Sequence, residues 1–229
     1  MVIHGLQKLT LLDFPGKVAC TVFLGGCDFR CPFCHNGELL DAGAPAVMDE
    51  AELLTFLQKR ARLLEGVCFT GGEPTLRPEL SALIRRVKAL GLAVKLDTNG
   101  NHPAVLRALL DDGLVDYVAM DVKNAPARYG ETTGRPGIDL VPIRESIALL
   151  LEGRCAYEFR TTVVRELHDP DDFAALGELI AGAERCYLQC FTDRDTVLRP
   201  GLHAPSREML DRCMSALRPY VKSVELRGV

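Results

Sequence analysis

The sequence lacks the features that mark several large classes of protein. Its start has no basic segment followed by an apolar one, so we expect no signal peptide and a cytoplasmic location. With 48% hydrophobic and 25% charged residues, it has the composition of neither a disordered or collagen-like chain nor a polytopic membrane protein. Basic residues are scattered and the formal net charge is −4, so we expect neither nucleic acid nor a membrane as a partner.

The sequence also has no linker or change in composition that would divide it, so we predict one domain over residues 1–229. It has no Gly-x-Gly-x-x-Gly fingerprint, which argues against a doubly wound dinucleotide-binding sheet. Its nine cysteines are an odd number in a chain without an export signal. We therefore expect metal or redox chemistry rather than disulfides.

Hydrophobic periodicity predicts strands that alternate with helices. The predicted strands are Val18–Phe23, Val67–Phe69, Ala93–Leu96, Val115–Val122, Tyr157–Val164 and Cys186–Phe191, with a further short one at Val224–Leu226. The predicted helices begin near Asp49, Pro78, Pro103, Pro142, Asp171 and Ser206. Glu52, three residues after Asp49, predicts a capping box at the first of them. Six alternating units imply a parallel sheet, but an eight-fold barrel typically needs about 250 residues. We predict an α/β fold, a partial, open (β/α)6 TIM-like barrel with parallel strands; a doubly wound sheet is the alternative.

Polar clusters follow four of the predicted strands. They are Cys27-x-x-x-Cys31-x-x-Cys34, Gly71-Gly72-Glu73-Pro74, Asp97-Thr98-Asn99-Gly100 and Asp121-Val122-Lys123. In parallel α/β folds the chemistry lies at the carboxyl ends of the strands, so we expect these clusters to meet at one site. Asp121 and Lys123 share a strand face, a spacing that is also typical of a simple ion pair.

The three clustered cysteines have three possible interpretations. Zinc would take them with His35, but adjacent residues rarely converge on one tetrahedral ion. Cys31-Pro32-Phe33-Cys34-His35 also matches a c-type haem attachment motif, which belongs outside the cytosol and leaves Cys27 without a role. A 4Fe–4S cluster held by Cys27, Cys31 and Cys34 would keep one iron open, and an open metal position is where a substrate binds. We favour the cluster.

Together, the three-cysteine loop and the Gly-Gly-Glu-Pro turn resemble the radical S-adenosylmethionine superfamily. More narrowly, residues 9–17, 25–27, 31–36, 95–100, 117–124, 158–164 and 225–228 resemble the activating proteins of anaerobic ribonucleoside-triphosphate reductase. The resemblance implies a 4Fe–4S cluster and S-adenosylmethionine as cofactors. It also implies an activity, in which a 5′-deoxyadenosyl radical takes a hydrogen atom from a glycine of the reductase.

The resemblance implies partners as well: the large subunit of the anaerobic reductase and an electron donor such as flavodoxin or ferredoxin. An incompletely closed barrel would leave a side opening for a loop of that subunit. The alternatives are an activase of another glycyl-radical enzyme, of the pyruvate formate-lyase type, and a radical enzyme acting on a small molecule such as a deazaguanine precursor. A zinc-stabilised binding module without catalysis is a third.

Individual roles follow from the same resemblance. Cys27, Cys31 and Cys34 would ligate iron, and Phe33 would lie along the adenine of the cofactor. Gly71 and Gly72 would let the backbone approach closely, and Glu73 would accept from the methionyl ammonium. Asp97, Lys123 and Arg160 are candidates for the carboxylate and ribose of the cofactor. Asp97, Thr98 and Asp121 match residues that hold a monovalent cation in the pyruvate formate-lyase activating enzyme.

Other features receive simpler interpretations. Cys155, Cys186, Cys190 and Cys213 lack the spacing of a second cluster, and buried free cysteine is a common small hydrophobe. His35 could donate a hydrogen bond to a cluster sulfur. Residues 124–137 and 192–205 form irregular stretches next to the predicted site, and we predict that they contact the partner.

Overall fold

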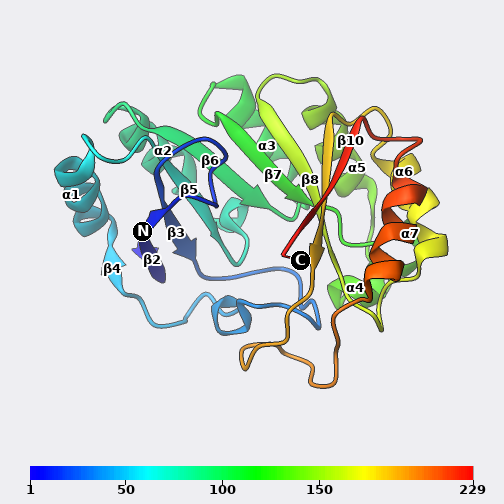
Figure 1. Cartoon of the computed structure of the whole chain (residues 1–229). Helices are drawn as coiled ribbons and strands as arrows, with labels where there is room; N and C mark the ends of the chain where they lie inside the picture. The colour runs from blue at the N-terminus through cyan, green and yellow to red at the C-terminus, as the bar shows by residue number, and fades with distance from the viewer. Residues whose placement is uncertain (229) are drawn as a thin grey trace.

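Eight strands form one continuous sheet in the computed structural model, which describes residues 1–228 (Figure 1). The strands are β2 (Gly5–Thr10), β3 (Ala19–Leu24), β5 (Gly66–Gly71), β6 (Ala93–Thr98), β7 (Tyr117–Asp121), β8 (Ala156–Val163), β9 (Arg185–Cys190) and β10 (Ser223–Arg227). Their order is β10-β9-β8-β7-β6-β5-β3-β2, and all neighbours are parallel except β2 with β3. Among the described residues β2 does not pair with β10, so the barrel stays open. The predicted partial, open barrel is confirmed.

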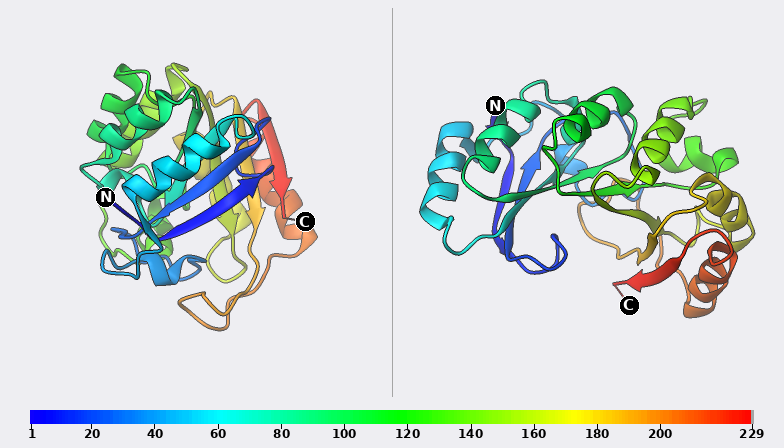
Figure 2. Two further views of the ribbon diagram at one scale, coloured as in Figure 1. Left: turned by 90° about the vertical axis from the view of Figure 1, so that its left-hand side faces the viewer. Right: turned by 90° about the horizontal axis from the view of Figure 1, so that it is seen from above.

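The helices cover the outer side of the curved sheet (Figure 2). Within residues 1–228 they are α1 (Glu50–Arg60), α2 (Leu80–Lys88), α3 (Pro103–Asp111), α4 (Tyr129–Thr133), α5 (Val141–Leu151), α6 (Phe173–Leu179) and α7 (Arg207–Leu217). The predicted capping box opens α1, where Asp49 accepts from the Glu52 amide and Glu52 accepts from the Asp49 amide. No helix of the described chain is both long enough and apolar enough to cross a bilayer.

Four of the strands and α-helices were not predicted from the sequence: β1 (Val2–Ile3), β2, β4 (Met48–Asp49) and α4. The antiparallel edge strand β2 has exposed side chains at its centre, so its sequence shows no buried alternation. A two-stranded antiparallel sheet joins β1 to β4, and both strands are too short for a periodic signal. The five-residue helix α4 lies within an irregular stretch and ends at Gly134 in the left-handed conformation. Short elements and strands with exposed centres therefore show no hydrophobic periodicity in the sequence.

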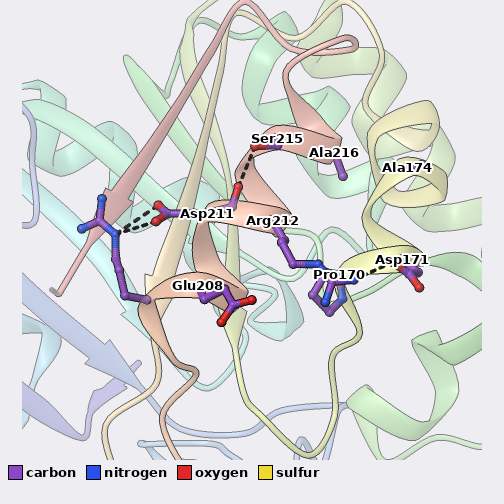
Figure 3. Close-up of a pocket in the computed structure, with 9 residues that line it drawn as sticks. Pro170, Asp171, Ala174, Glu208, Asp211, Arg212, Ser215 and Ala216 are labelled. Carbon is purple, nitrogen blue, oxygen red and sulfur yellow. Dashed lines mark hydrogen bonds and ion pairs between the residues drawn. The ribbon is translucent and has the colours of Figure 1, made fainter.

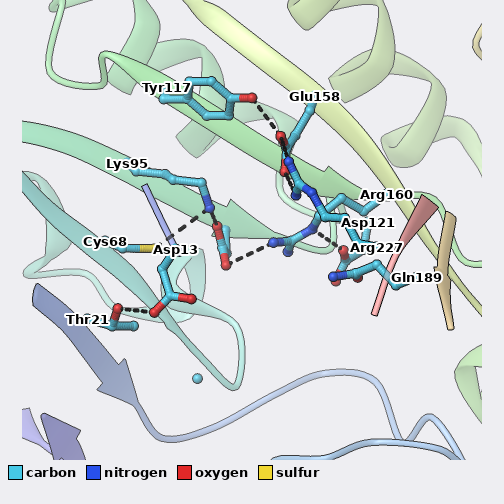
Figure 4. A network of polar contacts seen from close by, with 12 residues as sticks. Asp13, Thr21, Cys68, Lys95, Tyr117, Asp121, Glu158, Arg160, Gln189 and Arg227 are labelled. Carbon is cyan, nitrogen blue, oxygen red and sulfur yellow. Dashed lines mark hydrogen bonds and ion pairs between the residues drawn. The ribbon is translucent and has the colours of Figure 1, made fainter. Parts of the chain in front are cut away.

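The two faces of the sheet differ sharply in polarity. The face toward the helices is apolar, with Val94, Leu96, Val118, Met120 and Phe159 fully buried. The opposite face lines the inside of the partial barrel with Lys95, Asp97, Tyr117, Asp121, Glu158 and Arg160 (Figure 4). Barrels of this class usually fill the interior with branched aliphatic residues. This chain instead places paired charges there.

An ion pair between the half-buried Arg227 and the buried Glu158 connects the edge strand β10 to the interior. The carboxylate of Glu158 is fully buried and accepts two hydrogen bonds from Arg227, at 2.6 and 2.8 Å, and one from the Tyr117 hydroxyl at 2.6 Å. The Arg227 guanidinium also lies 3.3 Å from the centre of the Tyr187 ring. Since Arg227 is on β10 and Glu158 on β8, the pair ties two strands across β9.

Replacing Arg227 by Met should destabilise the protein, because it leaves the Glu158 carboxylate buried without its cation. We expect the free energy of unfolding in urea to fall by about 3 kcal/mol. Arg212 is the control, since it is largely exposed and pairs with the exposed Asp171, so Arg212→Met should cost less than about 0.5 kcal/mol.

A second substitution separates the lost charge pair from lost packing. Adding Glu158→Gln to Arg227→Met removes the unpaired charge and should recover part of the lost free energy. An Arg227→Met variant as stable as Arg212→Met would show that the buried pair does not hold β10.

Candidate functional site

All the predicted site residues line one cavity of about 250 Å³ at the carboxyl ends of the parallel strands. These are Cys27, Cys31, Phe33, Cys34, Gly71, Gly72, Glu73, Asp97, Thr98, Asp121, Lys123 and Arg160. Their roles in ligand binding remain predictions. Phe29, His35, Asn36, Asn99 and Gln189 also line the cavity and were not predicted as ligand-binding residues.

A larger, open groove of about 810 Å³ lies elsewhere, beside α6 and α7 (Figure 3). Four of its five charged side chains are already paired: Arg207 with Asp211, and Arg212 with Asp171. It holds none of the predicted site residues, and the cavity at the strand ends is therefore the candidate site.

The three clustered cysteine thiols are held in a poorly solvated place. Burial raises the pKa of Cys27 to about 12 and that of Cys31 to about 11, and it also raises the pKa of Cys34. The thiols therefore stay protonated at neutral pH until a metal centre displaces their protons. Within residues 1–228, no three His, Cys, Asp or Glu side chains gather as ligands of one ion. All three thiols nevertheless line the same cavity.

Later parts of the chain hold the cysteine loop in place by backbone contacts. The Arg30 amide donates to the Thr133 carbonyl oxygen at 2.9 Å, and the Arg199 amide donates to the Pro32 carbonyl oxygen at 3.0 Å. His35 contributes through Nε2, which lies 2.7 Å from the Thr192 carbonyl oxygen. The stretches 124–137 and 192–205 thus pack on the cysteine loop, and their contact with a partner remains a prediction.

Asp28, inside the cysteine loop, connects it to the end of β6. Its carboxylate accepts from Asn99 at 2.8 Å and Asn101 at 2.5 Å, and it pairs with His102 at 3.1 Å. Burial would raise the pKa of Asp28, but these partners outweigh it and lower the pKa to about 2. The sequence analysis missed this role. The one sign of this role in the sequence is that Asp28 is an acidic residue between Cys27 and Cys31.

The Gly71-Gly72 turn packs backbone against backbone. The Gly72 amide donates to the Leu24 carbonyl oxygen at 2.8 Å, and the Glu73 amide donates to the Gly26 carbonyl oxygen at 2.7 Å. Gly71 has a φ of +116°, and a Cβ on Gly72 would lie 2.1 Å from the Gly26 oxygen. Only glycine fits at both positions.

Glu73 joins the ends of β5 and β6. Its carboxylate is almost fully buried; Oε1 accepts from Thr75 and from the Thr98 hydroxyl, and Oε2 accepts from the Asn99 amide at 2.7 Å. Burial raises the pKa of Glu73, and these hydrogen bonds oppose that rise. Within the described chain Oε2 accepts a single bond, which leaves it capacity for the predicted ammonium group.

Charged side chains from β6, β7 and β8 meet at the inner end of the cavity (Figure 4). Arg160 pairs with Asp97 at 3.1 Å and with Asp121 at 2.9 Å. Lys95, which the sequence analysis missed, pairs with Asp97, while Lys123 pairs with Asp121 at 2.9 Å. Lys95 could have been noticed because it precedes Asp97 by two residues on the same strand face.

The aromatic ring of Phe33 lies between a cation and a histidine. The Lys123 ammonium is 5.9 Å from the ring centre, and the His168 ring is 6.4 Å away, edge to face. Phe33 is nearly buried and lines the cavity. Its predicted contact with adenine remains a prediction.

Comparison with known proteins agrees with this geometry. The Radical SAM superfamily matches residues 21–179. A protein of Methanocaldococcus jannaschii, whose name assigns it provisionally to the glycyl-radical enzyme activating enzymes, is 28% identical over 236 residues, covering 100% of this chain and 96% of that protein. A 7-carboxy-7-deazaguanine synthase of Hyperthermus butylicus is 32% identical over 199 residues, covering 85% of this chain and 77% of the synthase.

A solved structure gives the same fold. A domain of the pyruvate-formate lyase-activating enzyme from Bacteroides vulgatus superposes with a TM-score of 0.57 at 21% identity, covering 71% of this chain and 99% of that domain. The fold, the site and the family match together define the class of the protein, which is a radical iron–sulfur enzyme. This chain belongs to the Radical SAM superfamily, whose members bind a 4Fe–4S cluster and S-adenosylmethionine. The three thiols, the glycine turn and the charged inner end fit both cofactors.

Replacing Gly72 by Ala should remove most of the iron and sulfide bound after anaerobic reconstitution. The added Cβ collides with the Gly26 carbonyl oxygen next to Cys27, so the cysteine loop must move. We also expect the melting temperature to fall by roughly 5 °C or more. Gly43→Ala is the control, because the nearest atom to its Cβ is 3.5 Å away. Equal iron content in the two variants would contradict the requirement for close backbone approach.

Proposed function

We propose that the protein is a glycyl-radical activase that acts on the large subunit of an anaerobic ribonucleotide reductase. One observation carries this proposal: the M. jannaschii relative, named for glycyl-radical activation, aligns with the whole of this chain and nearly all of its own length. The reductase as substrate rests on the sequence resemblance of residues 9–17, 25–27, 31–36 and 225–228. We place the activity in the cytoplasm, since a chain rich in free cysteines suits a reducing compartment.

The cofactors supply one-electron cleavage of a sulfonium to give a carbon radical, and the protein supplies placement and a dry site. Cys27, Cys31 and Cys34 would hold the cluster as thiolates. Glu73 would accept from the methionyl ammonium through Oε2, and Arg160 and Lys123 would face the carboxylate and ribose. Buried Phe33 would exclude water from the adenine side.

The open barrel supports a protein substrate. The edge strands β2 and β10 do not pair within residues 1–228, so a loop of the partner could reach the cavity between them. An electron donor such as flavodoxin or ferredoxin would reduce the cluster. The partner and the donor are proposals that rest on the family resemblance.

One small-molecule function has specific support. The deazaguanine synthase of H. butylicus is 32% identical over most of this chain, and the cavity of about 250 Å³ is compact. This second candidate predicts turnover without a protein partner. Activation of a pyruvate formate-lyase remains a variant of the first proposal. Family membership leaves the non-catalytic zinc module without support.

The ligand assignment predicts that Cys31→Ala loses the cluster. The reconstituted variant should lack the broad visible absorption of a 4Fe–4S centre and should not cleave S-adenosylmethionine after reduction with dithionite. Cys186→Ala is the control, since Cys186 is buried in the apolar core of β9 and does not line the cavity. A Cys186→Ala variant that lost its cluster as well would contradict the assignment.

The substrate assignment is tested by mixing the reduced wild-type protein and S-adenosylmethionine with the large subunit of the anaerobic reductase. We expect a glycyl radical signal in the electron paramagnetic resonance spectrum of the reductase, which needs the active cluster and is absent with Cys31→Ala. Pyruvate formate-lyase and the deazaguanine precursor are assayed in parallel. Cofactor cleavage without a glycyl radical on the reductase would overturn the substrate assignment and leave the class of enzyme intact.

A further inference from the structure

The two carboxylates at the inner end of the cavity already have cationic partners at every oxygen. For Asp97, Oδ1 contacts the Lys95 ammonium and Oδ2 contacts Arg160 Nη1 at 3.1 Å. For Asp121, Oδ1 contacts Arg160 Nε at 2.9 Å and Oδ2 contacts the Lys123 ammonium at 2.9 Å. The guanidinium of Arg160 therefore bridges the two carboxylates, and these five side chains form what we call the charged array.

We propose that Arg160 is a built-in cation that takes the place of a monovalent metal ion between Asp97 and Asp121, so that this enzyme binds S-adenosylmethionine without sodium or potassium. The sequence resemblance predicted such a metal ion at Asp97, Thr98 and Asp121. The geometry does not fit it, because an ion shared by Asp97 and Asp121 would need the position that the guanidinium holds. The hydroxyl of Thr98 is also engaged, as it donates to Glu73 at 2.8 Å and its oxygen accepts from the Gly100 amide at 3.1 Å.

The charge of the array opposes a further cation. Lys95, Lys123 and Arg160 carry three positive charges against the two carboxylates, and side chains of the array are mostly shielded from water. Of the neighbouring carboxylates, Glu158 is paired with Arg227, whereas Asp13 accepts a hydrogen bond from the neutral Thr21 hydroxyl. A metal ion would add a fourth positive charge at close range in a weakly screening medium.

These charges are fixed over the neutral range. Burial would raise the pKa of Asp121, but Arg160 and Lys123 outweigh it and lower the pKa to about 2. The same balance, with Arg160 and Lys95 as the cations, lowers the pKa of Asp97. A guanidinium cannot be deprotonated in a protein, so the bridge persists wherever both carboxylates are ionised.

The bridge requires arginine rather than lysine. Nε and Nη1 belong to one planar fork and serve two carboxylates on neighbouring strands at once. An ammonium is a point charge and offers no planar fork. Arg160 also keeps Nη2 without a hydrogen bond to any of residues 1–228 that the structure records, so this nitrogen can serve the carboxylate of the cofactor.

The first experiment measures S-adenosylmethionine binding to the reconstituted wild-type protein by anaerobic equilibrium dialysis. Buffers contain potassium chloride, sodium chloride or tetramethylammonium chloride, whose bulky cation cannot enter the array. We expect the three dissociation constants to agree within about twofold, far below the tenfold that corresponds to 1.4 kcal/mol. Binding that fails in tetramethylammonium and returns with potassium would overturn the proposal.

The second experiment removes the built-in cation. Arg160→Ala opens a space between Asp97 and Asp121, so its binding of S-adenosylmethionine should weaken about tenfold or more in tetramethylammonium and recover in potassium or sodium. Thallium-205 resonance of the protein without cofactor provides a readout that needs no activity: bound thallium should appear in Arg160→Ala and be absent from the wild type. Arg165→Ala is the matched control, since Arg165 is exposed and, within residues 1–228, pairs with Glu166 alone.

The outcomes separate cleanly. Thallium bound by the wild type and lost in Asp97→Asn would overturn the proposal, as would an Arg160→Ala variant that no monovalent ion rescues. If Arg160→Ala does not fold, Arg160→Lys decides with the wild type: the proposal expects it to gain dependence on potassium or sodium, and independence overturns it. The inference rests on S-adenosylmethionine as cofactor and needs no partner, so it can fail or hold whatever becomes of the reductase assignment.

Discussion

The site depends on a close approach of two backbone segments beyond the ends of β3 and β5. Gly72 and Glu73 donate to the carbonyl oxygens of Leu24 and Gly26, which sets the glycine turn against the start of the cysteine loop. Because Gly71 and Gly72 have no side chains, the two segments can approach closely enough for the thiols and Glu73 to line the same cavity. Glu73 in turn accepts hydrogen bonds from Thr98 and Asn99 at the end of β6. The close approach therefore positions the ends of β3, β5 and β6.

The interior of the barrel contains paired charges where other barrels have packed apolar side chains. A buried charge is costly unless it is paired, and each carboxylate of Asp97, Asp121 and Glu158 has a cation within hydrogen-bonding distance. The aliphatic contacts that usually fill a barrel are found instead on the side of the sheet that faces the helices. Stability and chemistry are thereby assigned to opposite faces of the same strands.

Sequence reasoning was reliable where periodicity or tight spacing acts over a few residues. The strand–helix alternation, the capping box at Asp49 and the cavity-lining residues were predicted because each depends on local pattern or on the edge where parallel strands end. The edge strand β2, the hub at Asp28 and the partnership of Arg160 with both carboxylates were missed. These depend on contacts between distant segments, and the sequence carries no local sign of them.

The contacts that hold the cysteine loop have a consequence for biosynthesis. Cys27 and Cys34 leave the ribosome early, but the backbone partners of this loop include Thr133, Thr192 and Arg199. At about 5–20 residues per second, the last of these is made roughly ten to thirty seconds after the thiols. Until then the nascent thiols lie in an unfinished pocket. The pocket that would take iron and sulfide is therefore complete only after residues far beyond the thiols have been made.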